Sequence, residues 1–307
     1  MTPDVAVIVP TYERAQVLGA SLASVLGQEG VTFEVIVVDD GSTDDTAGLV
    51  SGLADPRVRY IARSHAGIAA ARNAGLAAAT APYVAFHDSD DVALPGRLAR
   101  PVAFLRAHPD IDLVIQNGRM LAPEDEPDGT EQPWIEPRVA RTLTGRPLGV
   151  AEVFRWNLGQ LQGMCFTRRA LDATGPLDPS FEILDDLDLV LRVAVRFQAI
   201  FLDEPAFAYR RHPTGVARNR DKVRAEAIRL GDKLASEHPE ALARLGRATF
   251  VRRQARRWSR LAANRLRAGD AAGARAALGE ARTLAPHNVS YRLRALWLAL
   301  RASRKQD

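Results

Sequence analysis

Acidic side chains gather at three places in this sequence, and the first group is Asp88-Ser-Asp-Asp91, directly after the apolar run of residues 83–86. Three carboxylates this close repel one another and raise each other's pKa unless a cation sits among them. Hard oxygen ligands suit Mg(II) or Mn(II), which proteins usually share with substrate phosphates. An acidic turn that caps a helix expected from Leu94 onward would use the same residues.

The second group, Asp39-Asp-Gly-Ser-Thr-Asp44, ends the apolar run of residues 34–38. Its carboxylates could accept hydrogen bonds from a nucleobase or ribose, as an acid after the second strand does in dinucleotide folds. A turn and helix cap is the structural alternative. No Gly-x-Gly-x-x-Gly follows the first apolar run, and the chain has no Walker A lysine motif. A standard dehydrogenase or P-loop enzyme is therefore excluded.

The third group, Asp185, Asp186 and Asp188, opens a helix expected over residues 187–197. The helix dipole attracts Asp to this position, so one or two of them are explained by structure alone. Three exceed what capping requires, and one carboxylate could serve as a general base.

Basic side chains near these groups are individually weak signals. Tyr209-Arg-Arg-His212 offers cations and an imidazole beyond a short strand, and Arg72 and Asn73 lie on an expected helix. A solvated or packed role is the default for each of them. Nothing beside Cys165 marks it as a nucleophile, so a core position is expected.

The elements that must position these groups alternate between strand and helix signals over the first 90 residues, in the manner of βαβ units. Continuous apolar strands separated by helices predict a parallel sheet covered on both faces. In such a sheet, ligands bind at the carboxyl edge, where the polar residues gather here. The expected strands cover residues 5–9 (stopped by Pro10), 34–38, 58–61 and 83–86, and the expected helices cover 15–26, 44–53 and 67–79.

The rest of the chain is less regular and then helical. Residues 123–147 are rich in Pro, Asp, Glu and Gly, which indicates a long loop or flap. Strands are expected over 162–167, 199–202 and 207–210, and an apolar stripe at helical spacing begins at Asp221. Gly269-Asp270 is typical of a helix stop followed by an N-cap. Residues 258–286 lie close to tetratricopeptide-repeat spacing, which predicts one helical hairpin.

Composition separates the chain into an acidic body and a basic tail. Of 307 residues, 47% are hydrophobic and 25% charged, as in globular proteins. The net charge is +4, yet residues 241–307 carry +13 and the remainder −9. The single cysteine cannot form a disulfide within the chain. No basic segment precedes the first apolar run, so a signal peptide is not expected. Both features favour a cytoplasmic location.

Six segments, in this order, resemble the family 2 glycosyltransferases, inverting enzymes with the GT-A fold. They are Val7-Ile-Val-Pro-Thr-Tyr12, Val35-Ile-Val-Val-Asp-Asp-Gly-Ser-Thr-Asp44, Gly67-Ile-Ala-Ala-Ala-Arg-Asn-Ala-Gly75, Tyr83-Val-Ala-Phe-His-Asp-Ser-Asp-Asp91, residues 175–192 and Tyr209-Arg-Arg-His212. The resemblance implies an α/β GT-A domain over residues 1–220 with a mostly parallel, twisted sheet and helices on both faces. Its nucleotide-binding half is 1–120 and its acceptor and catalytic half 121–220. An all-α basic extension follows over 221–307.

The resemblance also implies a role for each matching position. Asp88 and Asp90 fall on the Asp-x-Asp motif, with Asp90 a direct ligand of Mn(II) or Mg(II) beside Asp88 and His212. Arg210 and His212 match residues at the diphosphate. The nucleotide, usually UDP, would be held by Pro10, Thr11, Tyr12, Glu13, Asp40, Arg72, Asp88 and Ser89.

Two departures from the family pattern matter. Asp186 matches the catalytic base of the family's Glu-Asp motif, but Asp185 stands where the family has Glu, so the two could exchange roles. His87 replaces an apolar residue before the Asp-x-Asp motif, where it either tunes the site or packs.

The function so implied is metal-dependent, inverting transfer of a sugar from a nucleotide-sugar to a hydroxyl of a glycan, a lipid-linked glycan or another acceptor. The acceptor pocket is expected around residues 123–147 and 156–164. A nucleotidyltransferase competes with this interpretation, but it carries a Gly-rich, basic loop after the first strand, unlike residues 10–14. A non-catalytic scaffold that binds partners through its tail is the other alternative.

The basic tail has two interpretations. Arginine-rich amphipathic helices attach proteins to anionic lipid head groups, which would suit peripheral contact with the inner face of a membrane. Arginines could also simply solvate the outer face of packed helices or contact the acidic body. No recognition motif accompanies the charge, so nucleic acid is not an expected partner.

Overall fold

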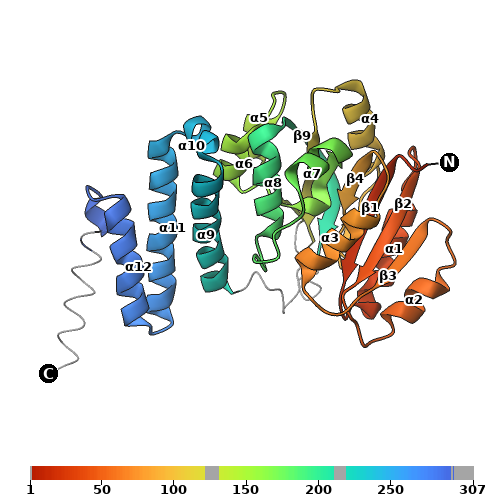
Figure 1. The fold of residues 1–307 in the computed structure, drawn as a ribbon, viewed down its shortest axis with the longest axis horizontal. Helices are drawn as coiled ribbons and strands as arrows, with labels where there is room; N and C mark the ends of the chain where they lie inside the picture. The colour runs from red at the N-terminus through yellow and green to blue at the C-terminus, as the bar shows by residue number, and fades with distance from the viewer. Residues whose placement is uncertain (1, 122–130, 211–218, 292, 294–307) are drawn as a thin grey trace. The chain divides into compact units, whose positions relative to one another are not determined.

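The structure is a computed structural model, and it describes residues 2–121, 131–210, 219–291 and 293. The chain divides into two compact units, residues 1–213 and 214–307, and each is described by itself (Figure 1). The division lies close to the boundary expected at residue 220 but falls among residues 211–218, outside the described part.

The first unit is built on one sheet whose described strands follow the order β3-β2-β1-β4-β8-β6-β9-β5, with β7 paired to β6. The strands are β1 (Val5–Thr11), β2 (Phe33–Asp39), β3 (Val58–Ala62), β4 (Tyr83–Phe86), β5 (Val92–Ala93), β6 (Leu113–Met120), β7 (Gln132–Pro133), β8 (Met164–Thr167) and β9 (Ala199–Tyr209). The strands β1 to β4 are parallel, as predicted. Beyond β4 the sheet is mixed, because β8 runs antiparallel to both of its neighbours and β6 pairs parallel with β9.

Pro10 does not end the first strand, contrary to the prediction. Pro10 and Thr11 pair with Val38 and Asp39 of β2, whereas β4 ends at Phe86, opposite Ile8. Proline has no N–H to donate to a neighbouring strand. At Pro10 this costs no sheet hydrogen bond, because no described strand lies beside it on the β4 side. The β1 strand therefore extends to the edge where ligands bind in this class of sheet.

Helices cover both faces of the parallel part, as the alternation along β1 and β2 requires. Val5, Val7 and Val9 point to one face, where they pack with apolar residues of the helices α1 (Ala15–Leu26), α2 (Thr46–Gly52) and α4 (Ala99–Ala107). Ala6, Ile36 and Val38 point to the other face and pack against α3 (Ile68–Ala78). The sheet core is thus closed on two sides, as in Figure 1.

One glycine sets how closely α3 approaches the sheet. A Cβ at Gly75 would lie 2.4 Å from Cγ2 of Ile8, so only glycine fits here without a shift of the helix. This close packing fixes the height of α3 above β1 and hence the position of Arg72, one turn earlier.

The middle of the first unit holds more regular structure than the sequence suggested. The expected flap over residues 123–147 contains β7 and the helix α5 (Pro137–Leu143), whose Ala140 and Leu143 are buried; residues 122–130 lie outside the described part. Proline at the first helical position starts this helix because its missing N–H has no partner there in any case. The two expected strands between 199 and 210 form one strand, β9, with register shifts against β6. The helix expected from Leu94 begins only at Ala99, after β5.

The remaining helices of the first unit connect these strands. They are α6 (Val150–Trp156), α7 (Arg168–Thr174) and α8 (Asp185–Arg196), with a single 3-10 turn, η1 (Leu161–Gly163), before β8.

The second unit is helical in its described residues, as predicted from residue 221 onward. Its helices are α9 (Arg220–Glu237), α10 (Pro239–Leu245), α11 (Arg247–Arg267) and α12 (Ala271–Leu284). Apolar residues of α9, α11 and α12 form one small core. Gly269 has a φ of 85°, and the side chain of Asp270 accepts a hydrogen bond from the Gly273 N–H, so the predicted stop and cap join α11 to α12. No helix among the described residues is long and apolar enough to cross a membrane.

Candidate active site

The predicted polar groups meet at the carboxyl edge of the parallel strands. Thr11 at the end of β1 pairs with Asp39 at the end of β2, and β4 lies on the other side of β1 and leads directly into Asp88. Segments that are 77 residues apart in sequence are therefore brought to one edge by strand register alone.

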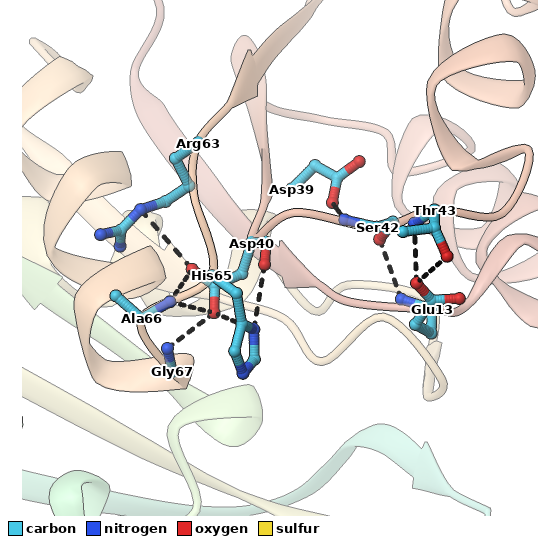
Figure 2. A network of polar contacts seen from close by, with 9 residues as sticks. All are labelled: Glu13, Asp39, Asp40, Ser42, Thr43, Arg63, His65, Ala66 and Gly67. Carbon is cyan, nitrogen blue, oxygen red and sulfur yellow. Dashed lines mark hydrogen bonds and ion pairs between the residues drawn. The ribbon is translucent and has the colours of Figure 1, made fainter.

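Asp40 is buried and organises the loop that connects β3 to α3. Its carboxylate accepts hydrogen bonds from the backbone N–H groups of Ala66, at 3.1 Å to each oxygen, and Gly67, at 2.7 Å. The guanidinium of Arg63 lies 3.5 Å away and the imidazole of His65 3.0 Å away (Figure 2). These contacts occupy the carboxylate, so within this structure Asp40 fixes the shape of the loop between β3 and α3.

Glu13 ties the end of β1 to the loop after β2. Its carboxylate accepts from the backbone N–H and the hydroxyl of Thr43 at 2.7 and 2.9 Å, and its own N–H donates to Ser42 Oγ at 2.8 Å (Figure 2). Glu13 has a φ of 52°, an uncommon conformation for a residue other than glycine. Glu13 thus holds two loops of the edge in register.

An exposed ring pair lies at the same edge. The Tyr12 and His65 rings have centroids 4.3 Å apart at an interplanar angle of 34°, and 45% of Tyr12 is exposed. Aromatic faces of this kind can stack on a nucleobase. Tyr12 was predicted as a nucleotide residue, whereas His65 was missed; its only sequence signal is its place just after a strand.

Arg72 joins two of the three acidic groups. Its Nη1 donates to Asp185 Oδ2 at 2.8 Å and its Nη2 donates to Asp88 Oδ1 at 2.9 Å, while 6% of its side chain is exposed. A guanidinium bound to two carboxylates is held rigidly, since both donors of its fork are fixed. Arg72 therefore holds the carboxylates of Asp88 and Asp185 in place.

The acids of α8 have three different environments. Asp188 is paired with Arg192 one turn later at 2.8 Å, and Arg192 also donates to backbone oxygens of Thr174 and Pro176. Asp188 is therefore structural. Asp185 is held by Arg72. Burial and the adjacent Asp185 carboxylate raise the pKa of Asp186 to about 8.

The Asp-x-Asp turn continues into a buried third acid. Asp90 lies 3.5 Å from the Arg14 guanidinium, and Asp91 accepts a hydrogen bond from the backbone N–H of Arg210 at 3.2 Å. The other oxygen of Asp91 makes no hydrogen bond within the described residues. Burial, reinforced by Asp88 and Asp90, raises the pKa of Asp91 to about 9. The predicted Arg210 is thus at this turn, and Arg14 joins it as a residue that the prediction missed.

His87 and Cys165 pack rather than react. His87 is buried and its Nε2 lies 3.0 Å from Ser21 Oγ on α1, while burial and the nearby Arg97 lower its pKa to about 4. It is therefore neutral at neutral pH and anchors the Asp-x-Asp turn to α1. Burial raises the pKa of the Cys165 thiol to about 12, which matches the expected core position.

The carboxylates at this edge can hold a divalent cation only if water and substrate phosphates complete its coordination shell. Asp88 and Asp90 supply hard oxygen donors, and one buried oxygen of the neighbouring Asp91 makes no hydrogen bond within the described residues. Within the described residues no group of three or more His, Cys, Asp or Glu side chains is arranged to hold a metal alone. This suits ions that keep one or two carboxylates and complete their shell with water and substrate phosphates.

The remaining predicted positions are distributed as follows. Pro10 and Thr11 are buried at the end of β1, and Ser89 is buried in the Asp-x-Asp turn. His212 lies outside the described residues. In the segment expected to line the acceptor pocket, Trp156 is 37% exposed, with the Arg155 guanidinium 5.3 Å from its ring centroid.

An open α/β sheet with polar residues gathered at its carboxyl edge is typical of proteins that bind a ligand at this edge. The profile of glycosyl transferase family 2 matches residues 6–171, more than half of the chain. The chain belongs to this family, as its motifs predicted.

Curated relatives match over part of their length. The succinoglycan biosynthesis protein ExoO of Rhizobium meliloti is 43% identical over 126 residues, which are 39% of this chain and 36% of ExoO. The UDP-Glc:alpha-D-GlcNAc-diphosphoundecaprenol beta-1,3-glucosyltransferase WfgD of Escherichia coli is 34% identical over 102 residues, which are 33% of this chain and 40% of WfgD. The alignments thus span well under half of either relative.

Solved structures share the fold over nearly the whole chain. Residues 1–349 of Staphylococcus aureus TarS superpose with a TM-score of 0.68 and 19% identity, covering 93% of this chain and 81% of that one. The mannosyltransferase PcManGT of Pyrobaculum calidifontis, in complex with GDP-Man and Mn²⁺, gives a TM-score of 0.62 at 22% identity, covering 97% and 85%. The fold is that of the GT-A transferases, with a helical C-terminal part.

Proposed function

We propose that this protein is an inverting glycosyltransferase that moves a sugar from a UDP-sugar to a hydroxyl group of a glycan or lipid-linked glycan. The observation that carries the proposal is the bridge from Arg72 to Asp88 and Asp185. It links the donor side of the site to the acidic end of α8 through one buried guanidinium. It also leaves Asp186 as the acid of the α8 pair that this guanidinium does not bind.

Asp186 is the proposed general base. A carboxyl whose pKa lies near neutrality combines a usable ionised fraction with the driving force to accept a proton. Asp186 meets this condition because burial and Asp185 raise its pKa to about 8. Asp185, one residue earlier, is committed to Arg72 and serves as a positioning residue.

The reaction is a single in-line displacement at the anomeric carbon. Asp186 accepts the proton of the acceptor hydroxyl as its oxygen forms the new bond to that carbon. The bond from the anomeric carbon to the diphosphate oxygen breaks, and its electron pair leaves with UDP. Arg14 and Arg210, both at the Asp-x-Asp turn, are the cations proposed to face the departing charge.

A divalent cation, Mn(II) or Mg(II), would be held by Asp90 and Asp88, with His212 as a further ligand implied by the family pattern. When bound, it supplies positive charge that stabilises the leaving diphosphate. The structure of PcManGT in complex with GDP-Man and Mn²⁺ supports this assignment.

The donor side is proposed from chemistry and from the relatives. The Tyr12 and His65 rings form a face on which uracil can stack, and Asp40 and Glu13 hold the loops around it. TarS has been solved with UDP-GlcNAc, and WfgD is named for a UDP-Glc donor. These names support a UDP-sugar donor here.

The class of acceptor is likewise proposed from what the relatives are named for. ExoO is named for succinoglycan biosynthesis and WfgD for an acceptor on diphosphoundecaprenol. We therefore propose a glycan acceptor, lipid-linked in the first instance, used in the cytoplasm, where the single cysteine stays reduced.

Thermal unfolding with nucleotides tests this function first. The melting temperature should rise with UDP or one UDP-sugar in the presence of Mn(II), and much less with GDP, ADP or CDP. Removal of metal with a chelator should abolish the rise, because the proposed site needs substrate phosphates and metal together. No shift with any nucleotide would contradict the proposal and favour a non-catalytic scaffold.

A further inference from the structure

The helical unit carries a stripe of exposed arginines along α11. Arg252, Arg256, Arg260 and Arg267 are all exposed, at spacings of four, four and seven residues. Residues three, four and seven apart share one helix face, so these side chains line one side of α11 over about 22 Å. The helix contains eight arginines and neither Asp nor Glu between Arg247 and Arg267.

The stripe is kept apart from the helical core. On the opposite side of α11, Leu261 and Ala262 pack with Ala274 and Leu278 of α12 and with Ile228 of α9. The arginines therefore have no part in holding the helices together. None of the four forms an ion pair with a described carboxylate; the nearby Asp221 is 3.4 Å from Arg265, off the stripe.

The neighbouring helix α9 widens the positive surface. Arg220 is exposed and Arg224, one turn later, is partly buried. Partial burial and the guanidinium groups of Arg260, Arg267 and Arg220 lower the pKa of Arg224, and Asp221 offsets part of this effect. Like charges gathered on adjacent helices cost free energy unless an anionic partner offsets the repulsion.

We propose that the arginine stripe, Arg252, Arg256, Arg260 and Arg267, is a docking surface for a bilayer of anionic lipids. Exposed guanidiniums on a straight helix can reach head-group phosphates without apolar insertion, and each contributes independently. The described stripe has no aromatic side chain to stack bases and no Asn or Gln to read them, so nucleic acid fits it less well. The choice of lipid over other polyanions rests in one respect on the proposed function, because a lipid-linked acceptor is itself in a membrane.

Vesicle co-sedimentation of the whole chain tests the proposal. The protein should sediment with vesicles of equimolar phosphatidylcholine and phosphatidylglycerol, and little with phosphatidylcholine alone. Raising the salt should release it, since exposed charges are screened within roughly 10 Å at 0.1 M salt. Equal binding to both vesicles, or binding that salt does not weaken, would overturn the proposal.

A matched pair of variants locates the surface. Arg252→Gln/Arg256→Gln/Arg260→Gln removes three charges from the stripe, and Arg247→Gln/Arg275→Gln/Arg282→Gln removes three exposed charges elsewhere in the same unit. Each near-surface arginine is worth roughly a factor of five in membrane affinity, so the stripe variant should lose about a hundredfold. The matched variant should lose much less; equal losses would show that net charge alone drives binding, and would overturn the proposal.

Two controls separate this proposal from its alternatives. Mixed-sequence DNA that binds in a stripe-dependent way, without vesicle binding, would make the stripe a nucleic-acid surface and overturn the membrane assignment. UDP-dependent thermal stabilisation should be unchanged in both triple variants. Vesicle binding without any nucleotide effect would refute the proposed enzyme while supporting the docking surface, so the two proposals fail separately.

Discussion

Arginine is used differently in the two units of this chain. In the first unit Arg72 and Arg192 are largely buried and held by the carboxylates of Asp185, Asp88 and Asp188. In the second unit the arginines of the α11 stripe are exposed and have no carboxylate on their own helix. A buried guanidinium with fixed partners sets geometry, whereas an exposed one supplies charge at a distance. Substitutions should therefore change rates and folding in the first unit and long-range association in the second.

The largest expected effect is that of Asp186→Asn on transfer. Asn cannot accept the acceptor's proton, so kcat should fall by roughly a thousandfold. UDP and metal should still raise the melting temperature, because Asp186 makes no proposed contact with either. Initial rates and thermal shifts on the same preparation check this. Loss of both transfer and nucleotide binding would instead give Asp186 a structural role.

The next effect is on stability, from Asp188→Asn. It leaves the buried Arg192 without its carboxylate, and breaking a buried pair costs about 3 kcal/mol of the free energy of unfolding. Denaturant unfolding measures this loss. The pH dependence of kcat should not move, since Asp188 is not part of the proposed chemistry. A shifted profile would mean that Asp188 belongs with the catalytic acids.

Arg72→Gln should shift the pH profile of transfer. In the wild type, kcat should rise with pH toward about 8 as Asp186 loses its proton. Arg72 lowers the pKa of Asp186, so its removal should raise that pKa and move the rising limb to higher pH. Arg72→Lys keeps the positive charge, so the rising part of its pH profile should lie close to that of the wild type. Its kcat should stay below the wild-type value, because one ammonium group cannot bind both carboxylates as the guanidinium does. An unmoved limb in Arg72→Gln would separate Arg72 from the base.

Asp91→Asn should change the pH dependence of stability in metal-free buffer. The folded state raises the pKa of Asp91 to about 9, above its value in an unfolded chain. Its contribution is therefore fully present below about pH 4 and is lost as pH rises toward 9. The melting temperature of the variant should fall less steeply than that of the wild type between these limits. Parallel curves would contradict the burial of an ionisable Asp91.

The smallest effect is expected from the stripe. Replacing Arg252, Arg256 and Arg260 by Gln should change the free energy of unfolding by less than about 0.5 kcal/mol at each site, because these exposed side chains form no ion pair with a carboxylate in the part of the chain that the structure describes. Relief of repulsion around Arg224 should make the sign stabilising. Denaturant unfolding checks this. A large loss would show that the stripe holds the helices together and would remove the contrast between the units.

Much of the first unit follows from local pattern. Short apolar runs ended by polar residues predicted β1 to β4, and the alternation of strand and helix predicted their parallel order. The three acids at the start of α8 were also visible in the sequence, whereas the pairing of Asp188 with Arg192 became known only from the structure. The mixed half of the sheet was harder to predict, because antiparallel β8 and the single long β9 depend on partners far away in sequence.

The sequence by itself determined the family, the fold class, the acids of the edge and the charge division between body and tail, because each is written in residue types at short spacing. Only the tertiary structure showed that Asp185 and Asp186 differ in their contacts, since Arg72, which binds Asp185, is more than a hundred residues away in sequence. Likewise, only the fold placed His65 against Tyr12 and His87 against Ser21. A side chain's role at such a site depends on which distant groups the sheet brings within a few ångströms, and spacing along one chain does not encode that distance.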